Sequence, residues 1–206
     1  QGMFREADSF NQDISSWDVS SGTNFIDMFW NADAFNQDIS AWDVSSGITF
    51  AGMFRDNNSF NQDISSWDVS SATSIAWMFA GADAFNQEIG SWDVSSVNNF
   101  EVMFANANGS PFNGDISSWD VSSGTSFAWM FSDSEVFNQD IRSWNVSSGT
   151  NFGNMFNGAT LMKNNYGFST TPTSSEFDWI APLAPSTPDL SAVSDTGSSS
   201  TDNITT

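Results

Sequence analysis

Acidic side chains recur along this sequence with a period of 25 residues, and they are the residues whose chemistry must be considered first. One column of carboxylates begins at Asp13, and a second follows each repeated tryptophan: Asp18, Asp43, Asp68, Asp93 and Asp120. Paired carboxylates such as Asp13 and Asp18 are the groups that glycosidases use for acid–base catalysis. Because the pair recurs in nearly every repeat, nothing sets the pKa of one carboxyl apart from the others. We therefore interpret the chain as non-catalytic.

The composition leaves few other chemistries open. The chain contains no Cys and no His, which excludes disulfides, thiolate or imidazole metal sites and any Ser-His-Asp triad. Oxygen-only ligands suit calcium, so calcium bridging adjacent copies of the Asp18 column is one interpretation. The alternatives are that these carboxylates accept bonds from backbone N–H and Ser hydroxyl groups in turns, or that water solvates them. No cofactor is expected, apart from that calcium.

The charge of the chain limits its partners. There are 4 Lys+Arg against 25 Asp+Glu, which gives a formal net charge of −21. Nucleic-acid binding and attachment to anionic membranes both depend on cationic side chains, so neither partner is expected. No apolar run reaches the roughly 20 residues that a membrane-spanning helix needs. Cations, polar glycans and matrix proteins remain compatible with this composition.

The sequence is an internal repeat. Each unit reads Ile14-x-x-Trp17-x-Val19, followed by Met28-Phe29, and the 25-residue period is broken once by a two-residue insertion around residues 108–111. A period of 20–50 residues indicates a solenoid of stacked coils. Apolar side chains that recur at one position are expected to form its core. The tryptophans predicted to lie there are Trp17, Trp42, Trp67, Trp92, Trp119 and Trp144.

Two elements are expected in each coil. The alternation of Trp17 and Val19 predicts a short parallel strand over residues 16–20. Apolar side chains at helical spacing predict a short helix from Phe25 to Ala32. The predicted fold is therefore an α/β solenoid, similar to a leucine-rich repeat, with about six coils that each contain one short strand and one short helix.

We divide the chain into three parts. Residues 1–160 are the predicted repeat solenoid, 161–185 are its C-terminal cap, and the Ser/Thr/Pro-rich stretch 186–206 is a tail or linker. The sequence opens at Gln1 inside a repeat, which we interpret as a processed product or a part of a longer protein.

Two groups of residues depart from the repeat pattern and are candidate sites. Three tryptophans lie off the core register and are expected either to pack partly against the next coil or to contact a second subunit or a sugar ring. They are Trp30, Trp77 and Trp129. Four tripeptides match the N-glycosylation pattern. They begin at Asn57, Asn108, Asn145 and Asn203.

The repeated Phe-Asn-Gln-Asp-Ile-Ser-Ser-Trp-Asp-Val-Ser-Ser, followed by Met-Phe, resembles the BspA-type leucine-rich repeat surface proteins. The resemblance covers residues 1–157. It implies a secreted or cell-surface protein that is not an enzyme and that has a role in adhesion. The chain departs from the family's Val-Thr-Asn-Met pattern, with Gly22-Thr-Asn-Phe25 in that place. The family has no shared ligand site to transfer.

Two functions follow as expectations. The first is an extracellular structural protein whose coils stack head to tail with other copies of itself, as in a filament. The second is a monomeric cell-surface adhesion module that binds a glycan or a protein through the strand face that carries Asp18 and its repeats.

Overall fold

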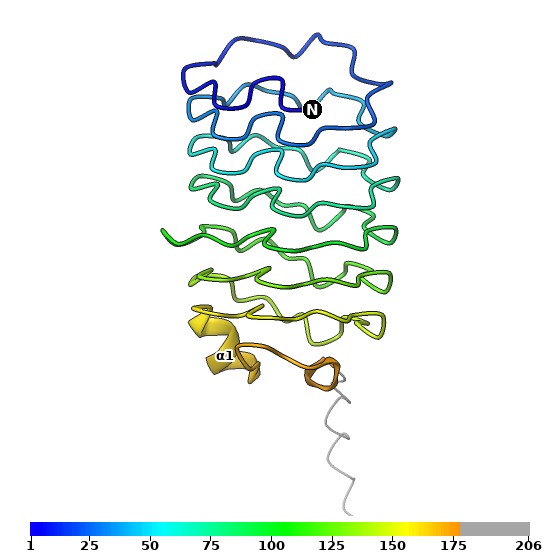
Figure 1. Cartoon of the computed structure of the whole chain (residues 1–206), viewed down its shortest axis with the longest axis vertical. Helices are drawn as coiled ribbons and strands as arrows, with labels where there is room; N and C mark the ends of the chain where they lie inside the picture. The colour runs from blue at the N-terminus through cyan, green and yellow to red at the C-terminus, as the bar shows by residue number, and fades with distance from the viewer. Residues whose placement is uncertain (178–206) are drawn as a thin grey trace, which may run out of the picture.

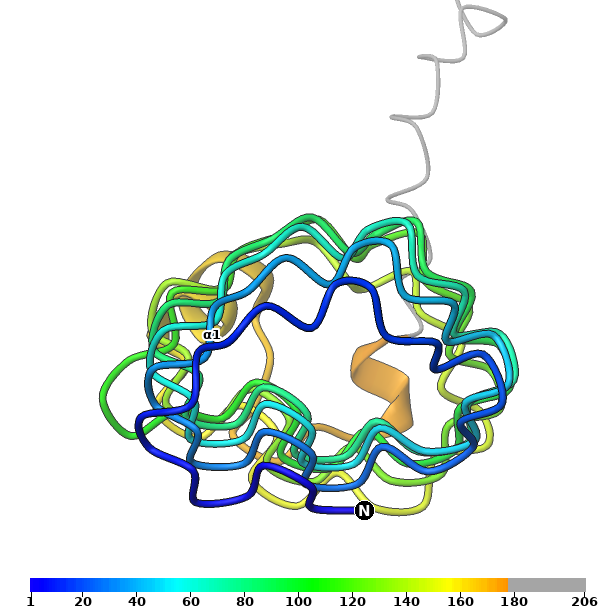
Figure 2. The same cartoon turned by 90° about the horizontal axis from the view of Figure 1, so that it is seen from above.

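The computed structural model of the chain describes residues 1–177, which form a stack of coils (Figure 1). Backbone hydrogen bonds join residues about one repeat apart, as from the N–H of Phe29 to the carbonyl of Met53 at 2.8 Å. Seen along the stack, successive coils have closely similar outlines (Figure 2). The coils contain almost no regular secondary structure, so the predicted α/β solenoid of one strand and one helix per coil is wrong.

The predicted strand over 16–20 is a pair of turns. The N–H of Trp17 donates to the carbonyl of Ile14 at 3.0 Å, and the N–H of Gly22 donates to Val19 at 2.7 Å. Between them, the carboxylate of Asp18 accepts the N–H of Ser20. Asp and Ser side chains that bond to nearby backbone compete with strand pairing, and this local chemistry outweighs the strand preference of Trp and Val. Parallel pairing between coils is reduced to isolated bridges, the first of which joins Asn24 to Thr49.

The predicted helix from Phe25 to Ala32 is a run of tight turns. The N–H of Met28 donates to the carbonyl of Phe25, three residues back, at 3.2 Å, whereas the N–H of Phe29 donates to Met53 in the next coil. Asp27 and Asn31 have φ values of 55° and 54°, in the left-handed region that an α-helix cannot contain. The left-handed residues lie four positions apart, so the turns bury the same positions as a helix would. The periodicity of the apolar residues could not distinguish the two structures.

Regular helices occur after the last coil. They are α1 (Thr160–Tyr166) and the short 3₁₀ helix η1 (Ser174–Glu176). No helix within residues 1–177 is long and apolar enough to cross a membrane.

Aromatic ladders form the core of the stack. One ladder begins at Phe4 and continues through the second residue of each Met-Phe pair, with ring centroids 5.4–6.0 Å apart. A parallel ladder begins at Phe10, with centroids 5.9–6.2 Å apart. Offset stacking at these separations is favourable beyond the burial of apolar area.

Polar side chains also bridge the coils. The side-chain oxygen of Asn11 accepts the N–H of Asn36 in the next coil at 3.0 Å, and the bond recurs along the stack. The indole N–H of Trp42 donates to the buried carbonyl of Ile14 at 3.1 Å, and four further tryptophans repeat this bond. These five indoles are at most 4% exposed, so the prediction that they lie in the core is confirmed. The same prediction is wrong for Trp17, which is 41% exposed because, in the described residues, the first coil has no preceding coil to pack on its indole.

The segment after the last repeat covers the final coil. Phe168 and Phe177 are buried, and the N–H of Phe156 donates to the carbonyl of Thr170 at 3.0 Å. In α1, Asn165 donates to Asn138 at 2.8 Å and so continues the asparagine ladder. Both the apolar and the polar ladders therefore end on partners in this segment. The predicted tail 186–206, and the end of the predicted cap beyond 177, lie outside the described residues.

Candidate functional site

The three off-register tryptophans project from the run of turns that replaces the predicted helix. Trp77 and Trp129 are 37% and 43% exposed, and Trp30 is half-buried. Trp77 and Trp129 occupy the same repeat position two coils apart, whereas Trp30 occupies the position three residues further on, together with Arg5 and Arg55. They lie on turns, whereas the helix predicted for this part of each coil would have carried them on its outer face.

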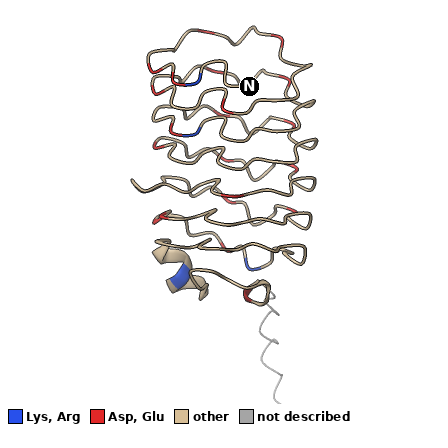
Figure 3. Cartoon of the chain, in the orientation of Figure 1, with Lys and Arg blue, Asp and Glu red and all other residues tan. Residues whose placement is uncertain are grey.

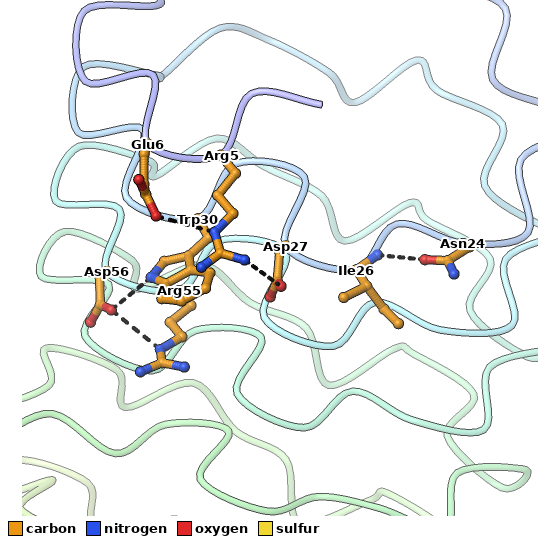
Figure 4. Close-up of polar contacts among 8 residues, drawn as sticks. All are labelled: Arg5, Glu6, Asn24, Ile26, Asp27, Trp30, Arg55 and Asp56. Atoms are coloured by element: carbon orange, nitrogen blue, oxygen red, sulfur yellow. Dashed lines mark hydrogen bonds and ion pairs between the residues drawn. The ribbon is translucent and has the colours of Figure 1, made fainter. Parts of the chain in front are cut away.

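Trp30 lies between two arginines (Figure 4). The guanidinium carbons of Arg5 and Arg55 are 3.7 and 4.6 Å from the centre of its ring. Its indole N–H donates to Asp56 at 3.0 Å, and the same carboxylate pairs with Arg55 at 3.2 Å. Arg55 also lies 4.4 Å from the ring centre of Trp77. With both ring faces and its N–H occupied, Trp30 belongs to the framework of the site.

Trp77 and Trp129 are held in a strained backbone conformation. Their φ values are 63° and 60°, and Gly52 at the equivalent position one coil earlier has a φ of 63°. A residue other than glycine in this region costs about 1–2 kcal/mol. The fold would therefore accept glycine at both positions more readily than tryptophan. Positive φ recurs at this position in the other coils as well, as at Val102 with 60°, so the fold imposes this backbone conformation. A large, exposed side chain kept at a position that suits glycine is a reason to look for function there.

A groove of about 630 Å³ lies beside these tryptophans. Trp77 and Trp129 form one part of its wall, Arg55 with Asp56 lies towards one end, and Asp133 lies towards the other. The two-residue insertion supplies another part of the wall and projects as a green loop from the outline of the stack (Figure 2). The structure thus brings together two of the predicted tryptophans and the one break in the repeat.

The groove exists because side chains along its floor become small. At the repeat position of Trp30 and Arg55, the next two coils carry Ala80 and Ala105, and Gly81 follows the first of these. A Cβ added at Gly81, whose φ is 67°, would meet the carboxylate of Asp56. The change from large to small side chains leaves open space over the two coils that carry Ala80 and Ala105.

The repeated carboxylates are bound within their own turns. The Ser70 hydroxyl donates to Asp68 at 2.6 Å and the Ser70 N–H donates at 3.0 Å, and together they lower the pKa of the Asp68 carboxyl below its ordinary value of 3.8. The same cause lowers the pKa of the carboxyls at Asp18, Asp43, Asp93 and Asp120. The interpretation that these carboxylates accept bonds in turns is confirmed.

Acidic side chains are spread over the whole stack, and basic ones are few (Figure 3). Within residues 1–177, no three Asp or Glu side chains converge in a way that would hold a metal ion. The acidic columns instead present one carboxylate per coil on an exposed surface. Calcium bridging between coils stays a prediction.

The asparagines of the candidate glycosylation sites differ in how exposed their side chains are. Asn57 is fully buried and its side-chain oxygen accepts the N–H of Phe60, so a glycan on its amide has no space in this fold. Asn108 is exposed in the inserted loop at the groove, and Asn145 is exposed on a turn, where its side-chain oxygen accepts the Ser147 N–H as the aspartates do. Asn203 lies outside the described residues.

The family described as "Mycoplasma protein of unknown function, DUF285" matches residues 1–111 and 108–176. The chain belongs to this family. No curated protein and no solved structure matches it. The match to DUF285 covers every coil of the stack and most of the segment that caps it, including the groove and both exposed tryptophans.

The role of Arg5 and Arg55 in this DUF285 chain was not among the predictions from the sequence. A signal was present, because Arg5, Trp30 and Arg55 stand at one repeat position in three successive coils. Stacked coils place such residues over one another, where a guanidinium and an indole attract. Gly52, Asp27 and Asn154 share the repeat position of Trp77, and Gly, Asp and Asn are the residues that most readily adopt a left-handed turn.

Proposed function

We propose that this chain is a non-catalytic, extracellular adhesion module of the BspA type within DUF285, and that the groove beside Trp77 and Trp129 is its binding surface. The observation that carries the proposal is the presence of two exposed, strained tryptophans on one groove. Exposed tryptophan is favoured at binding sites because it combines a large apolar face with a polar N–H. The groove replaces the strand face as the expected binding surface, since that face consists of turns.

The carboxylates support a role without catalysis. A glycosidase needs two carboxyls whose environments separate their pKa values. In this chain, Asp13 and Asp18 each accept bonds from a serine two residues later, and both pKa values move downward. The same arrangement recurs along the stack, so no acid is distinguished from a base.

Adhesion is better supported than head-to-tail assembly. A filament would require the last coil to be open to another copy. Phe168 and Phe177 cover that coil, and the N–H of Phe156 is already bonded to Thr170. Assembly through this end would first have to displace the covering segment.

The proposal can be tested with beads that carry the full chain. We expect the beads to be retained on surfaces coated with extracellular matrix or with whole cells. The double variant Trp77→Gly/Trp129→Gly should remove most of the retention, because it removes both exposed indoles while the backbone keeps a conformation that glycine prefers. Trp17→Ala, which lies outside the groove, should leave retention unchanged. Equal retention of the wild type and the double variant would contradict the proposal.

A further inference from the structure

The groove has the features of a polysaccharide site, and we propose that it binds a neutral glycan chain lying along the stack, with Trp77 and Trp129 each stacking on a different sugar ring. This assignment rests on the proposed adhesion role and names the ligand of the same groove. Four observations support it: the free edges of the two indoles, their spacing, the charge of the groove and the state of its backbone groups.

The two indoles are available to a ligand. Among residues 1–177, neither indole N–H has a hydrogen-bond partner, in contrast to Trp30, whose N–H is bonded to Asp56. Arg55 covers one face of Trp77, and within residues 1–177 no cation or aromatic ring lies over Trp129. Each indole therefore offers an apolar surface with a donor beside it, the combination that complements the C–H face and the hydroxyls of a sugar ring.

The spacing of the indoles suits an extended chain. Coils that are joined by parallel bridges lie about 4.8 Å apart, so residues two coils apart are separated by roughly 10 Å. That separation is too large for both indoles to enclose one ring, and it places them under different rings of one chain. The floor beside them is lined by the small residues Ala80, Gly81 and Ala105. In the coil between the two indoles, the same repeat position carries Val102, whose side chain is much smaller than an indole and also lines the groove.

The charge of the groove selects against acidic glycans. Arg55 is the only cationic residue among those that line the groove, and its guanidinium is already paired with Asp56 at 3.2 Å. Asp133 adds a further carboxylate to the wall, and the whole chain carries a net charge of −21. A uronate or a sulfate ester would enter without a compensating cation, whereas the hydroxyls of a neutral sugar can donate to these carboxylates.

The backbone of the groove does not favour an extended peptide. Peptides that bind along an edge need free backbone N–H and C=O groups. The N–H of Trp77 donates to Glu101, that of Ala80 to Trp77 and that of Gly81 to Ala105. These bonds use the groups that a peptide strand would require.

Titration calorimetry on the full chain, produced without N-glycans because Asn108 lines the groove, tests the assignment. The probes are neutral hexose and N-acetylhexosamine oligomers of increasing length, with uronate and sulfated oligomers of the same lengths for comparison. We expect affinity to rise with length until both indoles are spanned. Either single variant, Trp77→Gly or Trp129→Gly, should weaken binding at least about tenfold. Trp17→Ala should bind as the wild type does, and unchanged thermal melting of the glycine variants would show that they fold.

The outcomes separate this inference from the proposed function. If no neutral oligomer binds, or if acidic oligomers bind more tightly, the glycan assignment is overturned. If the glycan assignment is overturned but the double variant still abolishes adhesion of the beads, the groove binds a protein partner and the adhesion role stands. Failure of both the calorimetric and the adhesion experiments would overturn both proposals.

Discussion

Trp92 shows what a single repeated residue contributes to the stack. Its ring is 3% exposed and lies 6.3 Å from the ring of Phe79, and its N–H donates to the carbonyl of Ile64 at 3.0 Å. Trp17 has the same repeat position in the first coil, but it is 41% exposed. Replacing each of these tryptophans by alanine therefore compares the same substitution at a buried and at an exposed position.

We expect Trp92→Ala to lower the free energy of unfolding by about 3–5 kcal/mol, because it leaves a cavity and a buried carbonyl without a partner. At this chain length, each kcal/mol lowers the midpoint of thermal unfolding by roughly 2–4 °C. Trp17→Ala should have a much smaller effect. Trp92→Phe, which keeps most of the apolar area but loses the N–H, should fall between the two. Equal melting of both alanine variants would show that the indole columns do not stabilise the core.

The turns of each coil show where prediction from the sequence succeeded and where it failed. The 25-residue period indicated most of the buried apolar side chains, such as Phe25 and Phe29, but it also placed Trp17 in the core, and that residue is 41% exposed. It could not distinguish a helix from turns, since left-handed residues such as Asp27 preserve a helix-like spacing. Strand preference at Trp17 was outweighed by the bonds of Asp18 to Ser20.

The groove could be predicted only in part. Trp77, Trp129 and the insertion each depart from the repeat, so the sequence identified them separately. Their meeting at one place depends on the exact register of the coils and on the small residues Ala80 and Ala105, whose importance appears only once the coils are stacked. Asn57 was also predicted as a glycosylation site, because the N-glycosylation tripeptide gives no information on whether the asparagine side chain is buried.

The segment after the last repeat, which includes α1, covers the last coil of the stack and should contribute to its stability. Phe168 is 3% exposed, and its ring is 4.6 Å from Phe156 and 5.0 Å from Phe177. We expect Phe168→Ala to destabilise the chain by about 3–5 kcal/mol and to promote self-association through the uncovered coil. Leu161→Ala in α1, where the side chain is 36% exposed, is the matched control and should do neither. Thermal melting and sedimentation velocity measure both effects, and a monomeric, fully stable Phe168→Ala variant would contradict this role.

The acidic surface sets the response of the whole molecule to pH. Serine hydroxyl and N–H groups lower the pKa of carboxyls such as Asp43, Asp68 and Asp93 below 3.8 in the folded chain. Near that value the folded state binds fewer protons than the unfolded state, so stability rises with pH there and is lost as the pH falls through the folded pKa values. Repulsion within a chain of net charge −21 acts in the opposite direction, because acid relieves it.

We expect the turns to dominate, so that the midpoint of thermal unfolding changes little from pH 7 to about pH 5 and falls below about pH 4. Asn145 provides the control, because it fills the same repeat position with a neutral side chain whose oxygen still accepts the Ser147 N–H at 3.1 Å. The triple variant Asp43→Asn/Asp68→Asn/Asp93→Asn should therefore keep its turns and lose stability less steeply in acid. A midpoint that rises steadily from pH 7 to pH 3 would instead mean that repulsion between the columns outweighs the hydrogen bonds. In that case, added salt should raise the midpoint at pH 7 by a similar amount, because screening weakens the same repulsion.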